Sequence, residues 1–254
     1  MKRLIYSDLL AWKNRTSRKP LIILGARQVG KTWIMQHFGE QEYESVAYIN
    51  CDDMPQAIDL FKTDYDMDRI LLAIQTITGV KVLPGKTLII LDEIQEVERG
   101  LHALKYFCEK IPEYHVMVAG SLLGVTIGKG ESFPVGKVDI LKMYPMDYEE
   151  FCLATNNNYE LLRQIAMSGK SIGESTNRKL MRDLRIYMAV GGMPQAVEAY
   201  LRGDNFTKID FIKRQIIGLY EDDFKKIDPS GRMSAMYHSI PAQLSKDSRK
   251  YRIT

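Results

Sequence analysis

The chain alternates short apolar runs with longer segments in which apolar residues recur about every three or four positions. Four uninterrupted apolar runs fall in the first 120 residues, at 21–24, 46–49, 88–91 and 116–119. Runs of this length without polar alternation are typical of strands that are buried on both faces of a parallel sheet. A weaker run at 138–143 is a fifth candidate strand.

Helical patterns occupy the stretches between these runs, at 33–38, 66–78 and 101–111. An alternation of strands and helices predicts an α/β fold, in which helices cover a parallel sheet through right-handed crossovers. We therefore expect the first part of the chain to form one α/β domain around a five-stranded sheet.

The pattern changes after Pro145, where strand-like runs disappear and a periodicity near 3.6 residues takes over. We expect a helical subdomain here. Its helices are expected at 149–153, 160–167, 177–190, 195–201 and 206–220. A third element begins near Asp228, and the chain ends inside a segment that reads as extended. For this reason we expect the sequence to be part of a longer protein.

Composition and charge exclude several classes of protein. The 254 residues are enough for a sizeable core in one large or two modest domains. A net charge of +3, from 35 basic and 32 acidic residues, is too small to indicate a nucleic-acid-binding protein. Three cysteines without CxxC spacing argue against a disulfide framework and a zinc site. Neither a signal-peptide pattern nor an apolar stretch of about 18 residues occurs, so we expect a cytoplasmic protein without a membrane partner.

A phosphate-binding motif directly follows the first apolar run. The glycines of such a motif let successive backbone N–H groups point at phosphate oxygens, and the next helix adds the positive end of its dipole. Lys31 would place its charge on the β- and γ-phosphates, and the Thr32 hydroxyl would bind Mg²⁺. The eight residues that fit G-x-x-x-x-G-K-[ST], and that we expect to bind the nucleotide, are Gly25, Ala26, Arg27, Gln28, Val29, Gly30, Lys31 and Thr32.

Two carboxylates follow the apolar run at 88–91, as in a Walker B element. Asp92 would hold Mg²⁺, and Glu93 would orient and deprotonate the attacking water. Ligand sites of open α/β sheets lie at the carboxyl ends of the strands, where both residues are expected. A water-activating glutamate favours hydrolysis over transfer to another acceptor. Because no N-K-x-D guanine signature occurs, we expect the nucleotide to be ATP.

Ser121 is a third candidate near the terminal phosphate. It follows the run at 116–119, and it would sense the γ-phosphate or hold the water if that strand lies beside the Walker B strand. The alternative is a Gly-Ser turn without a contact to the nucleotide. Lys137 is a candidate for a further phosphate contact, and Arg182 and Arg185 are candidates for arginines of a lid. For each of the three, the alternative is an ordinary surface residue.

Several motifs together resemble a known family, the prokaryotic AAA-type P-loop ATPases of the AAA_14 family, which carry a DUF4143 domain at their C-terminus. The resemblance implies a core with strand order 5-1-4-3-2, a helical lid, and a winged-helix segment, here starting within 237–245, whose remainder would lie beyond this sequence. The motifs that carry it are the phosphate motif, Leu-Asp-Glu-Ile-Gln at 91–95, Ala-Gly-Ser at 119–121, Tyr-Pro-Met-Asp-Tyr-Glu-Glu-Phe at 144–151 and Gly-Gly-Met-Pro-Gln-Ala-Val at 191–197.

The resemblance and the periodicity together predict three parts: an ATPase core at 1–155, a lid at 156–227, and the start of a winged-helix-like domain at 228–254. Members of the family often have arginine where Lys137 follows Gly136 here, and lysine lacks the guanidinium fork. Without a clear arginine finger in the chain, we expect slow hydrolysis unless a partner or a neighbouring subunit contributes.

Two functions stay open at this point. In one, ATP hydrolysis drives movement of the lid and the C-terminal part. In the other, the protein is a slow ATP-gated switch or scaffold that binds a partner or DNA. Self-association and contact with DNA through the C-terminal part are open in both.

Overall fold

Five parallel strands form one sheet in the order β2-β3-β4-β1-β5 in the computed structural model, which describes residues 1–120 and 133–244. This order confirms the predicted 5-1-4-3-2 arrangement. The strands are β1 (Leu21–Leu24), β2 (Ser45–Asn50), β3 (Thr87–Asp92), β4 (His115–Ala119) and β5 (Asp139–Lys142).

The strand register brings the predicted chemistry to one edge of the sheet. Asp92, the last residue of β3, lies opposite Asn50 of β2 and Ala119 of β4. Ile23 of β1 is likewise paired with Ala119, so the loop that follows β1 begins at the same edge. Because all five strands are parallel, the phosphate motif and the two carboxylates meet there.

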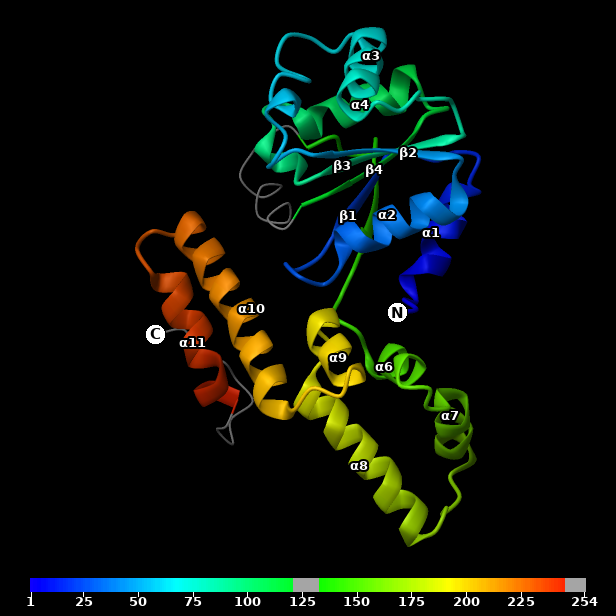
Figure 1. The fold of residues 1–254 in the computed structure, drawn as a ribbon, viewed down its shortest axis with the longest axis vertical. Coiled ribbons are helices and arrows are strands. Elements are labelled where there is room, and N and C mark those ends of the chain that lie inside the picture. The colour runs from blue at the N-terminus through cyan, green and yellow to red at the C-terminus, as the bar shows by residue number, and fades with distance from the viewer. Residues whose placement is uncertain (121–132, 245–254) are drawn as a thin grey trace.

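Helices cover both faces of the sheet (Figure 1). The helices α1 (Ile5–Lys13) and α2 (Lys31–Glu42) lie on one face, and α3 (Met67–Thr78) and α4 (Gly100–Lys110) lie on the other, together with the short 3₁₀ turns η1 (Pro55–Ala57) and η2 (Ile94–Glu96). The result is a three-layer α/β/α core.

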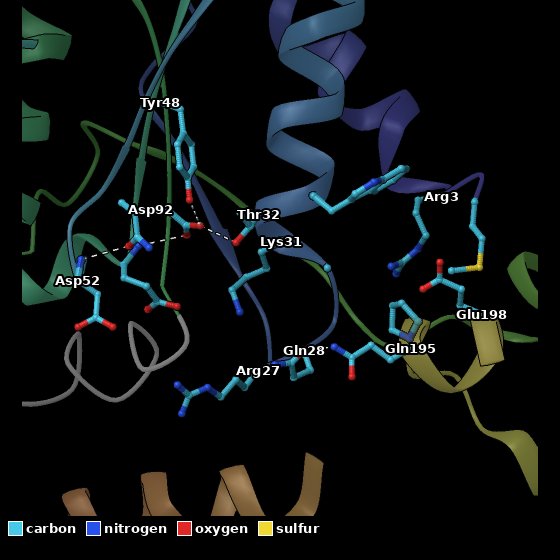
Figure 2. A pocket seen from close by; sticks show the side chains of 16 residues that line it. Arg3, Arg27, Gln28, Lys31, Thr32, Tyr48, Asp52, Asp92, Gln195 and Glu198 are labelled. Atoms are coloured by element: carbon cyan, nitrogen blue, oxygen red, sulfur yellow. Dashed lines mark hydrogen bonds between the residues drawn. The ribbon is translucent and has the colours of Figure 1, made fainter. Parts of the chain in front are cut away.

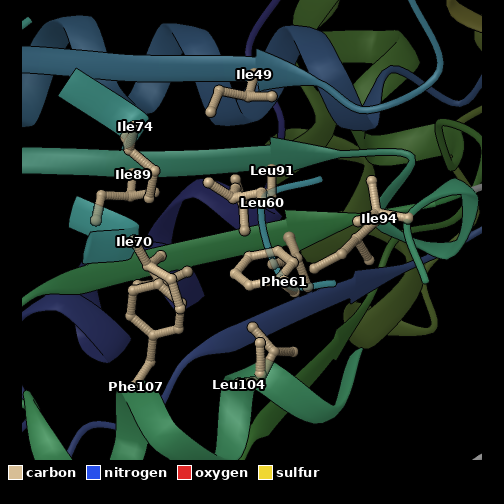
Figure 3. Close-up of a cluster of buried hydrophobic side chains, with 14 of the residues drawn as sticks. Ile49, Leu60, Phe61, Ile70, Ile74, Ile89, Leu91, Ile94, Leu104 and Phe107 are labelled. Atoms are coloured by element: carbon tan, nitrogen blue, oxygen red, sulfur yellow. The ribbon is translucent and has the colours of Figure 1, made fainter. Parts of the chain in front are cut away.

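The strand β3 shows why its sequence is apolar without interruption. Ile89 and Leu91 point into the cluster formed with α3 and α4, which also contains Phe107 (Figure 3). Leu88 and Ile90 point into the opposite cluster, formed with α1 and α2. Successive side chains of a strand alternate between faces, so a strand covered on both sides needs an apolar residue at every position.

Among the described residues, six helices follow β5, and we use the name lid for the region that they form. They are α6 (Tyr148–Ala154), α7 (Tyr159–Ser168), α8 (Glu174–Val190), α9 (Pro194–Leu201), α10 (Phe206–Ile227) and α11 (Arg232–Leu244). The lid has its own small hydrophobic cluster, which contains Met146, Phe151, Val190, Ala196, Val197, Ala199 and Ile209. Capping side chains mark three helix starts, because Asp147, Asn158 and Asn205 each accept a backbone N–H of the first turn.

Two of the motifs that carried the family resemblance pack against each other at the start of the lid. The Met146 N–H donates to the Gly192 carbonyl at 2.7 Å. A Cβ atom at Gly192 would lie 2.1 Å from the Met146 carbonyl oxygen, so only glycine permits this approach. Gly191 has φ +80°, a conformation that side chains rarely adopt. The segment 191–197 is therefore fixed on the segment 144–151.

Two features of the described residues differ from the sequence-based expectations. The helix α1 was not predicted, although Leu9 and Trp12 bury one of its faces. The helix α10 runs seven residues beyond the expected end at 220. The extended segment expected at the chain end falls within 245–254, outside the described residues. In the part of the chain that the structure describes, no helix combines the length and apolarity needed to cross a bilayer.

Candidate functional site

The loop between β1 and α2 curls back at the carboxyl edge of the sheet. Gly30 precedes α2 in the left-handed conformation, with φ +94°. Gln28 is also left-handed, with φ +67°, which is uncommon for a residue other than glycine. A Cβ atom at Gly25 would lie 2.3 Å from the Met143 carbonyl oxygen. Gly25 is thus required by the close approach of the chain after β5, and Gly30 by its backbone conformation.

Lys31 lies inside this loop. Its side chain folds back so that Nζ donates to the carbonyls of Gly25, at 2.8 Å, and Ala26, at 2.9 Å. The residue is only 7% exposed. Burial lowers the pKa of Lys31, and the nearby carboxylates of Glu93 and Asp92 oppose this by favouring the charged form. The ammonium group is therefore held inside the loop, and Lys31 lines the same pocket as Asp92 (Figure 2) and Glu93.

The two predicted magnesium ligands lie in contact. The Thr32 hydroxyl donates to Asp92 Oδ2 at 2.5 Å, and the Tyr48 hydroxyl approaches the same oxygen at 3.4 Å. Asp92 is 4% exposed, and this burial raises its pKa, while the hydrogen bond from Thr32 acts in the opposite direction. Burial and the adjacent Asp92 charge raise the pKa of Tyr48 to about 12, so its phenol stays protonated. The structure brings together one carboxylate and two hydroxyl groups.

Glu93 lies beside Asp92 and lines the same pocket. It has φ +50°, and its backbone N–H donates to Asp92 Oδ1 at 3.1 Å. Gln95 Nε2 donates to Glu93 Oε2 at 2.6 Å, which fixes the orientation of the carboxylate. Gln95 belongs to the motif at 91–95, but the sequence alone indicated no role for it.

A pocket of about 610 Å³ surrounds these groups. Its wall combines the loop, the carboxyl edge of the sheet, the N-terminal segment and the helix α9 of the lid. The lining residues are Met1, Arg3, Arg27, Gln28, Gly30, Lys31, Thr32, Trp33, Tyr48, Asn50, Asp52, Asp92, Glu93, Pro194, Gln195 and Glu198. Sequence reasoning missed the contributions of Arg3, Trp33, Tyr48 and Gln195. The first three belong to no motif with a fixed spacing, and Gln195 lies in the motif at 191–197 but had no predicted role.

Arg3 ties the loop to the start of the lid. It is buried, and it donates to three acceptors: the Val29 carbonyl at 2.9 Å, the Glu150 carboxylate at 3.0 Å and the Tyr144 carbonyl at 2.7 Å. Glu150 also accepts the backbone N–H of Leu4 at 2.7 Å. One arginine therefore joins the N-terminal segment, the phosphate motif and the helix α6.

Two helices of the lid contact the loop directly. Gln195 Nε2, on α9, donates to Gln28 Oε1 at 2.9 Å. On α10, Asp223 Oδ1 accepts from Arg27 Nη1 at 2.7 Å, and the Tyr220 hydroxyl donates to the Arg27 carbonyl at 2.9 Å. The side chains of Arg27 and Gln28 therefore both reach the lid.

The remaining candidates lie elsewhere. Lys137 pairs with Glu109 at 2.8 Å and does not line the pocket. Arg182 and Arg185 are exposed on α8 and do not line it either. Ser121 lies outside the described residues. Across 1–120 and 133–244, no three His, Cys, Asp or Glu side chains come together as a metal-binding group.

Comparisons with known proteins agree with this geometry. The AAA_14 family model, described as an AAA domain, matches residues 17–152, and the model of a domain of unknown function (DUF8612) matches residues 181–252. The DUF4143 part of the resemblance is therefore not shown, since the model that matches the C-terminal part is a different one. No curated protein matches the chain.

Solved structures with a similar fold include a Walker-type ATPase of Pyrococcus abyssi, at 16% identity and a TM-score of 0.53, covering 91% of this chain and 77% of that one. AMPPCP-bound DnaA of Aquifex aeolicus has 14% identity and a TM-score of 0.41, and the match covers 98% of this chain and 71% of DnaA. The ADP form of the ORC2 protein of Aeropyrum pernix has 16% identity and a TM-score of 0.41, and the match covers 85% of this chain and 68% of ORC2. At these identities the likeness is one of fold, and it is carried by the first structure.

The AAA_14 model covers more than half of the chain, including the phosphate motif and both carboxylates. The sheet order and the loop geometry are those of a P-loop ATPase. The chain belongs to the AAA_14 family of AAA domains.

Proposed function

We propose that the protein binds ATP together with Mg²⁺ and hydrolyses it, and that the lid moves with the state of the nucleotide. The observation that supports this most strongly is the convergence of Lys31, Glu93 and the pair Thr32–Asp92 on one pocket. Nucleotide binding and hydrolysis are the activities that the AAA family suggests. The missing guanine signature favours adenine.

The residues fit a magnesium ion. The Thr32 hydroxyl and the Asp92 carboxylate are hard oxygen donors that lie 2.5 Å apart on the pocket wall, and Mg²⁺ prefers one or two such groups together with phosphate oxygens. A bound magnesium ion would offset the negative charge of the phosphates. Thr32 and Asp92 would be the residues that hold it.

The protein groups have separate roles in the proposed reaction. Lys31 Nζ donates to the Gly25 and Ala26 carbonyls in this structure. When the nucleotide binds, the Lys31 ammonium donates to phosphate oxygens instead. Glu93 accepts a proton from the attacking water, and Gln95 holds its carboxylate in place. On the basis of the sequence, Ser121 is a further candidate for a contact to the γ-phosphate.

We infer the same division of the chain as from the sequence, with an ATPase core at 1–155, a lid at 156–227 and the start of a winged-helix-like domain at 228–254. In this narrower division α6 belongs to the core and α11 to the third part. The contacts of Gln195 and Asp223 to the loop support a second candidate function, that of a slow ATP-gated switch. In both functions the lid responds to the nucleotide. They differ in turnover, which is appreciable in the first and slow in the second.

Two substitutions test the proposal. Lys31→Ala is expected to abolish ATP binding measured by calorimetry, whereas Lys86→Ala, which removes an exposed lysine paired with Glu44, should leave it unchanged. Glu93→Gln is expected to keep ATP bound and to stop phosphate release. Glu98→Gln, which changes an exposed glutamate in the segment after η2, is the matched control. Normal ATP affinity in Lys31→Ala would refute the proposal.

Turnover of the parent protein separates the remaining alternatives. It is measured alone, with duplex DNA, and over a range of protein concentrations. Stimulation by DNA would support a DNA contact of the C-terminal part, and a rise of specific activity with concentration would indicate that a neighbouring subunit completes the site. Tight binding with slow turnover under all conditions would favour the switch.

A further inference from the structure

The side chain of Arg27 has no role in the function proposed so far. It lies inside the phosphate motif, yet its guanidinium Nη1 is 2.7 Å from Asp223 Oδ1 on α10, 196 residues later in the sequence. The Tyr220 hydroxyl, one turn earlier on the same helix, donates to the Arg27 carbonyl at 2.9 Å. The last turns of α10 therefore hold both the backbone and the side chain of one loop residue.

The two partners differ in exposure. The Asp223 side chain is 7% exposed, whereas that of Arg27 is 35% exposed and lines the pocket. A guanidinium has five N–H donors, and the ion pair uses a donor on Nη1. The exposed part of the Arg27 fork therefore faces the space in which we place the nucleotide.

The ion pair between Arg27 and Asp223 can persist when a phosphate binds to Arg27. If Arg27 turned away completely, Asp223 would be left as a buried carboxylate without this cation, which is strongly unfavourable. A guanidinium can instead bridge a carboxylate and a phosphate, because its donors lie along different edges of one plane. Asp223 thus orients Arg27 and leaves donors for a second anion.

The position of Arg27 indicates which phosphate it would meet. Figure 2 shows Arg27 on the side of Lys31 that faces away from Arg3 and Glu198. Arg27 and Lys31 line the same pocket, and Arg27 lies four residues before Lys31 in the loop. The Arg27 side chain therefore shares this pocket with the group that we assign to the β- and γ-phosphates.

We propose that the Arg27 side chain binds the terminal phosphate of the triphosphate, and that Asp223 is a positioning residue through which α10 responds to that phosphate. This inference rests on the proposed ATP binding and names the residue that distinguishes ATP from ADP. Arg27 supplies, from within the chain, the terminal-phosphate contact that Lys137 does not provide, and it does so through a helix of the lid.

The test compares the affinities for two nucleotides, each with Mg²⁺: ADP and an ATP analogue with a methylene group between the β- and γ-phosphates. For Arg27→Ala we expect the affinity for the analogue to fall roughly ten- to a hundredfold, as for loss of a charge-assisted hydrogen bond, and the ADP affinity to change by less than roughly threefold. Arg27→Lys should restore part of the loss. The ratio of the two affinities would not respond to a merely structural role.

Asp223→Asn keeps the shape of the side chain and is expected to lower the same ratio, by less than Arg27→Ala does. The double variant should be no worse than Arg27→Ala alone, since Asp223 acts through Arg27. Asp222→Asn is the matched control, because Asp222 is exposed on the same helix and pairs only weakly with Lys225, at 3.6 Å. Circular dichroism of each variant checks that it is folded.

Equal losses for ADP and the analogue, or additive losses in the double variant, would overturn the inference. An unchanged ratio in both Arg27→Ala and Arg27→Lys would do so as well. These outcomes differ from failure of the proposed function, in which the parent protein binds neither nucleotide.

Discussion

At the scale of single residues, Gly25 has a packing role in addition to its proposed part in phosphate binding. Its missing Cβ lets the chain after β5 pass close by, with the Met143 carbonyl 2.3 Å from where a Cβ would lie. The obstacle is backbone, which cannot rotate away as a side chain could. We expect Gly25→Ala to lower the free energy of unfolding by about 2 kcal/mol or more, measured by urea denaturation.

Gly218 provides the control for this prediction. It lies inside α10, and a Cβ there would meet no atom within 4 Å. Because alanine is the better helix former, Gly218→Ala should raise the free energy of unfolding by up to about 1 kcal/mol. Equal stability of the two variants would show that Gly25 is not constrained by β5.

His115 makes the stability depend on pH. It begins β4, is buried, and its Nδ1 lies 2.6 Å from the Tyr43 hydroxyl. Burial, together with the charges of Arg18 and Lys13, lowers its pKa from 6.5 to about 4. The unfolded chain therefore binds a proton below pH 6.5 that the folded chain does not bind until about pH 4. The neutral His115 side chain therefore contributes to the free energy of unfolding at neutral pH. This contribution, up to about 3 kcal/mol, is lost as the pH falls through this window.

Urea denaturation at pH 7.5 and pH 5 would measure this effect. The loss of unfolding free energy between the two pH values should be smaller in His115→Gln than in the parent. His238→Gln, which changes an exposed histidine on α11, should keep the part of the slope that His115 causes. If His115→Gln and the parent lose the same amount, the prediction is wrong.

The sequence was sufficient to predict that the loop, Asp92 and Glu93 meet at one pocket, because a motif of fixed spacing follows β1 and the two carboxylates stand at the carboxyl end of β3. It was not sufficient for Arg3 and Asp223. Arg3 meets Glu150 and Asp223 meets Arg27 across 147 and 196 residues. Contacts of this range follow from how the lid folds back, and neither periodicity nor a short motif encodes them.

At the scale of elements, the strands were easier to predict than the helices that surround them. The runs at 21–24, 46–49, 88–91 and 116–119 all lie within observed strands, because a sheet covered on both faces requires an apolar run. The edge strand β5 alternates in burial, with Ile140 44% exposed, and its signal was weaker for that reason. The helix α1 buries only Leu9 and Trp12, too few for a clear period.

The junction between the core and the lid depends on Gly192. A Cβ there would meet the Met146 carbonyl oxygen at 2.1 Å, and Gly192 also accepts the Met146 N–H. We expect Gly192→Ala to separate the segment 191–197 from the segment 144–151 and to displace α9 from the loop. Limited proteolysis should then cleave this junction faster than in the parent, with Gly218→Ala as the control. Resistance equal to the parent would contradict this role.

At the scale of the whole molecule, the lid is more weakly anchored than the core. Among the described residues, α7 and α11 have no buried side chain, and α8 buries only Val190. Elements with few buried apolar contacts open at low free energy. Of the lid helices, α9 supplies Pro194, Gln195 and Glu198 to the pocket, so a ligand there contacts both the core and the lid.

This difference predicts where hydrogen exchange responds to nucleotide. With the ATP analogue and Mg²⁺ at about a hundred times the dissociation constant, amides of α9 should exchange up to about a hundredfold more slowly, because bound ligand stabilises the closed arrangement. The helix α3 packs on the face of the sheet opposite to α2 and contributes no residue to the pocket, so the exchange rates of its amides should not change. Since α10 contacts the loop through Asp223 rather than lining the pocket, its last turns should respond to the analogue more than to ADP. Equal protection of α10 by both nucleotides would mean that the lid senses occupancy of the pocket but not the third phosphate.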